Sequence, residues 1–141
     1  MTDFLSPAER SERMSRIRGK DTRPEIVLRK VLHRLGLRFR LHRSGLPGKP
    51  DLIFPRYRAI VFVHGCFWHR HTCCAIATVP KSNTSFWLEK FDKNVSRDAR
   101  VTLELLELGW RVFVVWECEV SSITRAQITG ERLAREIRDG V

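Results

Sequence analysis

The sequence predicts an α/β domain in which helices flank a small mixed central sheet. Three short apolar runs, at 51–54, 59–63 and 111–116, have the length and composition of buried strands. Segments with a helical spacing of apolar residues lie before, between and after these runs. Strands that alternate with helices in this way favour a layered domain with helices on a sheet. The length of 141 residues corresponds to one domain.

The helices of this domain have recognisable ends. A capping box at Thr22 to Glu25 predicts a helix that continues to Leu35 and stops at Gly36. A long helix is predicted from residue 83 or 84 to about 108, and a last amphipathic helix over 124–139. The long helix is expected to bury one apolar stripe, formed by Leu88, Phe91, Val95, Ala99 and Leu106.

One further strand is predicted ahead of the apolar runs. Residues 38–43 alternate between basic and apolar side chains, which is typical of a half-exposed strand. The next seven residues, 44–50, are rich in Gly and Pro and predict a loop.

The charge of the chain indicates a polyanionic partner. The net charge is +10 and the isoelectric point is about 10.3. Residues 1–50 hold 13 Lys/Arg against 5 Asp/Glu, whereas residues 101–141 hold 5 against 7. Nucleic acid is the simplest partner for such a basic amino-terminal half. A solvated basic surface and an RNA-binding or ribosomal role are the competing interpretations.

The first 20 residues are predicted to form a basic arm that contacts DNA, beside a single domain over 21–141. Ser6 to Glu9 is a capping box with Pro at the first helical position, so a helix to about Arg18 is expected. Met14 and Ile17 are its main apolar residues. A helix with so little to bury is expected to order against DNA.

Composition also excludes several classes of protein. The chain is 43% hydrophobic and 30% charged, which is globular and not disordered. No apolar stretch approaches the ~20 residues of a membrane span, and the first residues do not resemble a signal peptide. We therefore expect a cytoplasmic protein whose cysteines are reduced or metal-bound.

A nine-residue run from Cys66 to Cys74 carries most of the distinctive chemistry. It holds three of the four cysteines and two of the five histidines, with Phe67 and Trp68 between them. Thiolates and imidazoles at this spacing are ligands for zinc. Exposed aromatic rings are what a protein needs to wedge between stacked bases. The alternatives are unmetallated thiols and core aromatics.

A second group of candidate residues lies on the two strands before this run. Pro50-Asp51 followed by two strands resembles the restriction-endonuclease-like, or PD-(D/E)XK, nuclease fold, in which such a carboxylate holds Mg²⁺. That pattern has an acid and a Lys on the second strand, whereas this chain has Val61 to His64. His64 and His69 are candidate acid–base groups in place of the Lys. Each His is alternatively structural or a zinc ligand.

A wider set of segments is similar to the very-short-patch repair (Vsr) endonuclease family. These segments are Thr22 to Glu25, Leu46 to Asp51, His64 to His69, His71 and Cys73, Phe86 to Lys90, Lys93 to Val95, Arg97-Asp98, Leu108 to Val112 and Trp116 to Cys118. The resemblance implies a DNA endonuclease that nicks 5′ of the thymine in a T:G mismatch, the product of 5-methylcytosine deamination.

The same resemblance implies a catalytic site. It assigns Mg²⁺ to Asp51 and to the main-chain carbonyl of Val63, where a threonine would be expected. It makes His69 the general base, supported by His64 and Glu25.

It also implies a structural zinc site and a set of intercalating side chains. The zinc ligands are Cys66, His71, Cys73 and Cys118, and the spacing favours Cys73 over Cys74. The intercalating residues are Phe67, Trp68 and Trp87, with Met14 entering from the other groove.

Partners and location follow from this resemblance. Double-stranded DNA with a T:G mismatch is the expected substrate, and mismatch-repair proteins are candidate partners. We expect a monomer in the bacterial cytoplasm, associated with the nucleoid. Two alternatives stay open: a nuclease of the same fold with another DNA target, and a non-catalytic, zinc-stabilised DNA-binding module.

Overall fold

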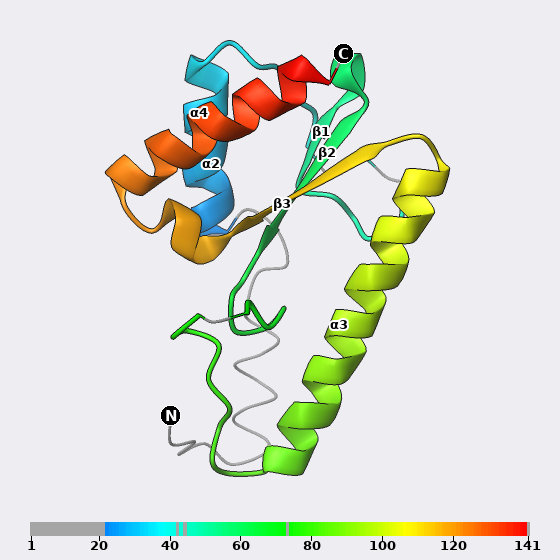
Figure 1. The fold of residues 1–141 in the computed structure, drawn as a ribbon, viewed down its shortest axis with the longest axis vertical. Coiled ribbons are helices and arrows are strands. Elements are labelled where there is room, and N and C mark those ends of the chain that lie inside the picture. The colour runs from blue at the N-terminus through cyan, green and yellow to red at the C-terminus, as the bar shows by residue number, and fades with distance from the viewer. Residues whose placement is uncertain (1–21, 42, 44, 73, 141) are drawn as a thin grey trace.

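The computed structural model describes residues 22–41, 43, 45–72 and 74–140, and within them helices cover both faces of a three-stranded sheet (Figure 1). The predicted helix at 6–18, with Met14, lies outside the described residues. The helices are α2 (Arg23–Arg34), α3 (Thr84–Glu107) and α4 (Ile123–Asp139), the strands are β1 (Leu52–Phe54), β2 (Ala59–His64) and β3 (Arg111–Trp116), and the 3₁₀ helices are η1 (Pro55–Tyr57) and η2 (Glu117–Val120). None of these helices is long and apolar enough to cross a membrane.

The sheet is mixed, as predicted, with the order β1-β2-β3. β1 pairs antiparallel with β2 through the short connection 55–58, in which Arg58 has a positive φ of 51°. β2 pairs parallel with β3, in the register Ala59 to Arg111 through His64 to Trp116. Parallel strands need a long crossover, and α3 lies within that connection.

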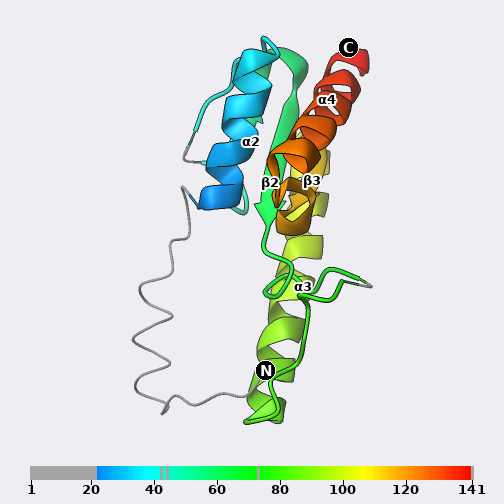
Figure 2. The same ribbon diagram turned by 90° about the vertical axis from the view of Figure 1, so that its left-hand side faces the viewer.

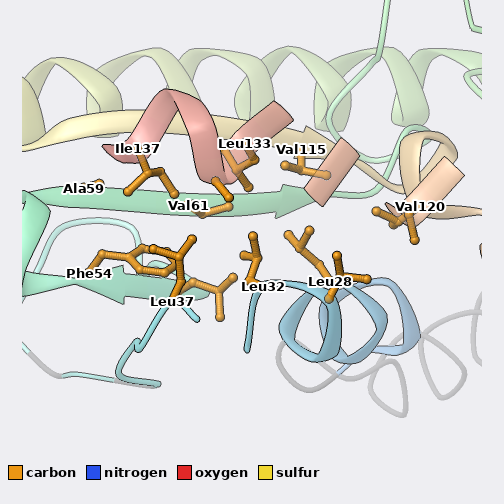
Figure 3. Close-up of a cluster of buried hydrophobic side chains, with 14 residues drawn as sticks. Leu28, Leu32, Leu37, Phe54, Ala59, Val61, Val115, Val120, Leu133 and Ile137 are labelled. Atoms are coloured by element: carbon orange, nitrogen blue, oxygen red, sulfur yellow. The ribbon is translucent and has the colours of Figure 1, made fainter. Parts of the chain in front are cut away.

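Side chains that alternate along the strands build a core on each face of the sheet. Ala59 and Val61 of β2 face α2 and α4, and Ile60 and Phe62 face α3. The core on the α2/α4 face also includes Leu28, Leu32, Leu37, Phe54, Val115, Val120, Leu133 and Ile137 (Figure 3). In Figure 2, viewed at right angles to Figure 1, α2 and α4 lie next to each other in front, with β2 visible between them and α3 behind. Both faces of β2 are therefore buried, which explains its uninterrupted apolar sequence.

The start of α2 agrees with the prediction in position but not in mechanism. Thr22 precedes the helix, yet its side chain caps no backbone N–H, so the predicted capping box is wrong. Its Oγ1 donates instead to Oε1 of Glu25 at 3.0 Å. Glu25 is only 2% exposed and also accepts from Arg29 Nη2 at 3.1 Å. The carboxylate is thus turned into the domain instead of back to the helix start.

The predicted buried stripe of α3 is largely wrong. Phe91 is buried, but Leu88, Val95, Ala99 and Leu106 are exposed, and Trp87 and Leu105 are buried in their place. The 24 residues of α3 span ~36 Å, against ~20 Å for a six-residue strand. The amino-terminal half of α3 therefore projects beyond the sheet (Figure 1) and buries side chains only where the segment after β2 contacts it.

The predicted strand at 38–43 is reduced to a single bridge between Arg40 and Ile53. Arg40 N donates to Ile53 O at 2.8 Å, and Ile53 N donates to Arg40 O at 3.0 Å. The chain then turns away through Gly45, Gly48 and Lys49, all with positive φ. This loop places Asp51 directly before the start of β1.

The contact between α2 and α4 depends on Gly130. A Cβ at this position would overlap Cγ1 of Val31. We predict that Gly130→Ala lowers the free energy of unfolding by about 1–3 kcal/mol, although Ala is the better helix former. Chemical denaturation of Gly130→Ala, Val31→Ala and the double variant measures this effect. The double variant should lose less than the sum of the single variants, and strict additivity would contradict the predicted overlap.

Candidate active site

A cleft of about 880 Å³ collects nearly all of the predicted catalytic residues. It lies between the start of α2, the loop before β1, the end of β2 and the inner face of α3. The predicted site residues that line it are Glu25, Asp51, Val63, His64, Phe67, Trp68 and His69. Segments more than 40 residues apart in the sequence therefore meet in one cavity.

Asp51 is held at the end of the β1–β2 pair. Its N–H donates to Val61 O at 3.1 Å, and its carboxylate Oδ2 accepts from Val63 N at 2.6 Å. It is thus the N–H of Val63 that bonds to Asp51. The predicted role of the Val63 carbonyl as a metal ligand stays a prediction.

The surroundings of Asp51 disfavour its ionised form. Burial raises the pKa of Asp51 from 3.8 to about 7, the Val63 N–H opposes this shift, and the nearby carboxylate of Glu25 adds to it. Two carboxylates in one buried cleft repel each other, and a divalent cation relieves that repulsion. Hard carboxylate oxygens are also the ligands that Mg²⁺ prefers. Asp51, with Glu25 beside it, therefore fits a divalent metal.

In the same cleft as Asp51, two histidines and an aspartate form a compact group. The rings of His64 and His69 stack with centroids 3.9 Å apart and planes 7° apart. His69 Nδ1 lies 2.6 Å from Asp98 Oδ2 of α3. Burial, followed by the charge of His69, lowers the pKa of His64 from 6.5 to about 4, so His64 is neutral at neutral pH.

Asp98 had no predicted role, although Arg97-Asp98 was among the matching segments. When its carboxylate accepts the Nδ1–H of a neutral His69, the Nε2 of that imidazole carries no proton and can accept one. No local sequence signal identifies Asp98, because its function depends on which face of α3 docks against the sheet.

The three groups His64, His69 and Asp98 are also close enough to hold an ion. Their geometry does not favour this, because a metal ligated by imidazole lies in the ring plane. Two parallel rings stacked face to face cannot both direct in-plane nitrogens to one ion. The arrangement suits proton transfer better than metal binding.

A second cluster of side chains, which includes Cys66 directly before Phe67, could hold a metal ion. The ligand atoms of Cys66, His71, Cys74 and Cys118 all lie within 4.8 Å of one another. His71 Nδ1 is 3.6 Å from Cys66 Sγ and 3.5 Å from Cys118 Sγ. Three thiols and one imidazole form the donor set of a closed tetrahedral zinc site.

The tandem cysteines Cys73 and Cys74 are the two candidates for the fourth position of this cluster. Cys74 is the member that the described part of the chain brings into the cluster. Cys73 lies outside the described residues, so its predicted role as the fourth ligand stays a prediction. Burial raises the pKa of the Cys66 thiol to about 12, whereas hydrogen bonding from the backbone of Ile76 lowers that of Cys74.

The predicted intercalating aromatics pack together at one side of the cleft. The ring of Phe67 lies 5.1 Å from Trp68, 5.8 Å from Trp87 and 5.1 Å from Phe91. Phe67 and Trp68 are half-buried, but Trp87 is only 6% exposed. Intercalation by all three stays a prediction, and in this conformation Trp87 supports the other two.

Arg70 holds the main chain around this aromatic cluster in place. Its guanidinium donates to the carbonyls of Phe67, Ala77 and Thr78 at 2.9–3.1 Å. It also lies 4.0 Å from the centroid of the Phe91 ring. Three carbonyl contacts and a ring contact make Arg70 an internal brace of this loop.

Asp51 allows a pH-dependent prediction for the magnesium-free protein. Its pKa rises from 3.8 to about 7 on folding. Below pH ~4 the carboxyl is protonated in the folded and unfolded states, so its burial does not change the free energy of unfolding. From about pH 4 to 7 the burial lowers the free energy of unfolding progressively, and above pH 7 this loss is constant. Asp51→Asn removes this cost. We predict that the variant gains stability over the wild type progressively from pH 4 to 7, reaching about 2–4 kcal/mol.

Denaturation at several pH values, in magnesium-free buffer that keeps zinc, measures this gain. Asp92→Asn, at an exposed position on α3, is the control. A gain for Asp51→Asn that is the same at pH 4 and pH 8 would contradict the assignment.

Comparison with known proteins agrees with this geometry. The family model described as "DNA mismatch endonuclease Vsr" matches residues 2–75. The type II nicking enzyme V.XorIIP of Xanthomonas oryzae pv. oryzae is 51% identical over 123 residues, which is 87% of this chain and 90% of that protein. V.NmeAIP of Neisseria meningitidis serogroup A is 44% identical over all of both chains. DNA mismatch endonuclease Vsr of Escherichia coli K12 is 43% identical over 141 residues, which is all of this chain and 88% of that protein. The chain therefore belongs to the Vsr family of DNA mismatch endonucleases and is a hydrolytic DNA endonuclease.

Proposed function

We propose that the chain is a Mg²⁺-dependent endonuclease that nicks one DNA strand 5′ of the thymine in a T:G mismatch. The observation that supports this most is that one cleft is lined by Asp51, by the His69–Asp98 pair and by Phe67 and Trp68. A metal-binding carboxylate, a general base and a base-stacking surface are the three parts that a mismatch nickase needs.

The chemical step follows from the geometry of His69. Asp98 holds the Nδ1–H, so Nε2 accepts a proton from the attacking water. The water oxygen bonds to phosphorus, the P–O3′ bond breaks, and the leaving 3′-oxygen takes a proton from solvent. The products are a 3′-hydroxyl and a 5′-phosphate. Mg²⁺, held by Asp51, supplies neutralisation of the charge that develops on the phosphate.

His64 and Glu25 support this step. Neutral His64 stacks on His69, which orients the imidazole without adding a second positive charge. Glu25 places a second carboxylate beside Asp51 and so favours a bound cation over a proton. Cys66, His71 and Cys118, together with Cys73 or Cys74, would hold a separate zinc, which would fix the loop that carries His69.

Selectivity for the mismatch is assigned to the aromatic rings. Stacking contributes about 1–3 kcal/mol per base, and opening a mismatched step costs less than opening a paired one. We further propose that the basic arm contacts DNA, with Met14 in the other groove, and that the enzyme is a monomer. Its proposed location is the bacterial cytoplasm, at the nucleoid, and mismatch-repair proteins are candidate partners.

A panel of T:G, matched and branched duplexes tests the proposed substrate. Equal cleavage of matched and T:G duplexes would refute the specificity for T:G.

Removal of Asp51 tests the metal-dependent step. We predict that Asp51→Ala lowers Mg²⁺-dependent nicking of a T:G duplex by about three orders of magnitude or more, because the metal loses its main carboxylate. Binding of the duplex, measured by fluorescence anisotropy, should change by less than about threefold. Nicking at the wild-type rate would exclude Asp51 from catalysis.

Removal of the Asp98 charge tests the general base. Asp98→Asn keeps the shape but no longer stabilises the imidazolium or the reactive tautomer of His69, so kcat should fall by about 10²–10⁴-fold. KM should change little. The pH–rate profile separates this role from a structural one, since its lower limb should move in the variant. An unchanged kcat would contradict the role of the His69–Asp98 pair.

The Arg70 brace makes a prediction about selectivity. Arg70→Met keeps the apolar stem but loses the three carbonyl contacts, so Phe67 and Trp68 should be held less firmly. We expect the ratio of T:G to matched-duplex affinity to fall by about 5–20-fold. Arg100→Gln, an exposed change on α3, is the matched control. An unchanged ratio would show that Arg70 does not position the aromatics.

A further inference from the structure

A second hollow, of about 430 Å³, lies along the carboxyl-terminal half of α2. Its lining residues are Arg29, Lys30, His33, Arg34 and Phe39, none of which lines the catalytic cleft. Four of the five are basic residue types, and no acidic residue is among them. The hollow is therefore suited to an anion.

The basic side chains converge because of their spacing on the helix. Arg29 and His33 are four residues apart, or about one helical turn, and so are Lys30 and Arg34. All four side chains therefore share one face of α2. Lys30, His33 and Arg34 are exposed. Phe39 packs edge-on against Phe54 at 5.8 Å, and this fixed ring gives the alkyl stems of the basic residues an apolar surface.

The hollow and the catalytic cleft are consecutive sites on one helix. Thr22, Pro24 and Glu25, at the start of α2, line the cleft, and Arg29 is the first residue of the hollow. Arg29 Nη2 donates to Glu25 Oε2 at 3.1 Å, so one ion pair joins the two sites. The rise of 1.5 Å per residue separates Glu25 from Lys30 and Arg34 by ~7–14 Å.

We infer that this hollow binds a backbone phosphate of the duplex outside the step that is nicked. This inference rests on the proposed function, because it takes the scissile phosphate to lie at Asp51. Measured along the axis of the duplex, ~7–14 Å spans about two to four base pairs. Exposed basic groups bind an isolated anion weakly in water, whereas a polyanion gains affinity through the release of its counterions. Duplex DNA is thus the occupant that this open, basic hollow favours.

Such a contact would set the register of the duplex on the enzyme. Phosphate contacts carry no sequence information but fix position and orientation. With one phosphate in the hollow, rotation of the duplex about the scissile step is restricted, and the mismatch is aligned with the aromatic rings.

The double variant Lys30→Gln, Arg34→Gln tests the inference. Its affinity should fall about tenfold for T:G and matched duplexes alike, since a phosphate contact is independent of sequence. The plot of log affinity against log salt should become shallower by about 2. The control Arg100→Gln, Arg135→Gln removes the same charge from exposed positions on α3 and α4 and should weaken binding less than about threefold.

Methylphosphonate substitution locates the phosphate. Each phosphate within six nucleotides of the nick, on both strands, is replaced in turn by the neutral analogue. A substitution about two to four base pairs from the nick should weaken the wild type but not the double variant. If no position shows this coupling, or if the salt slope equals that of the control, the hollow is not a phosphate site.

The wild-type nick, mapped on the same duplexes, separates this result from the proposed function. If the enzyme nicks a different duplex, the proposed specificity fails. The phosphate scan, repeated on that duplex, still decides whether the hollow holds a backbone phosphate.

Discussion

The parallel pairing of β2 with β3 is the constraint on which the site depends. It places His64 opposite Trp116, so that both strands end at the same edge of the sheet. Cys66 and Cys118 follow two residues later on each strand and come within ligand distance of His71. The N–H of Cys66 also donates to Glu117 Oε1 at 2.8 Å. Core side chains pack against both faces of β2. The segment that begins at Cys66 therefore starts from a fixed position at the end of this strand.

That segment is restrained from the opposite side by α3. Asp98 binds the His69 ring, and Asn94 Nδ2 donates to the carbonyl of Trp68 at 3.3 Å. His69 and Trp68 are therefore fixed between the sheet edge and the projecting part of α3. The length of α3 beyond the sheet, which leaves several of its apolar residues exposed, is what allows it to reach this segment.

The positions of β1, β2 and β3 and of the Asp51 carboxylate could be predicted because they depend on local patterns, whereas the strand predicted at 38–43 is only a bridge. An uninterrupted apolar run indicates β2, and Pro50-Asp51 before a strand indicates a functional carboxylate, which the structure places in the cleft. Asp98 and the inward turn of Glu25 could not be predicted, because they depend on how helices dock. The stripe on α3 was predicted wrongly for the same reason, since periodicity does not reveal how much of a helix meets the sheet.

We propose that the segment from Cys66 to Cys74 serves two separate metal sites, a structural zinc site and a catalytic magnesium site that includes Asp51. Native mass spectrometry of the wild type and of Asp51→Ala, coupled to nicking of the T:G duplex with and without magnesium, tests it most directly. We predict one zinc per chain in both proteins and nicking only by the wild type with magnesium. Loss of zinc from Asp51→Ala, or nicking by the zinc-loaded wild type without magnesium, would contradict it.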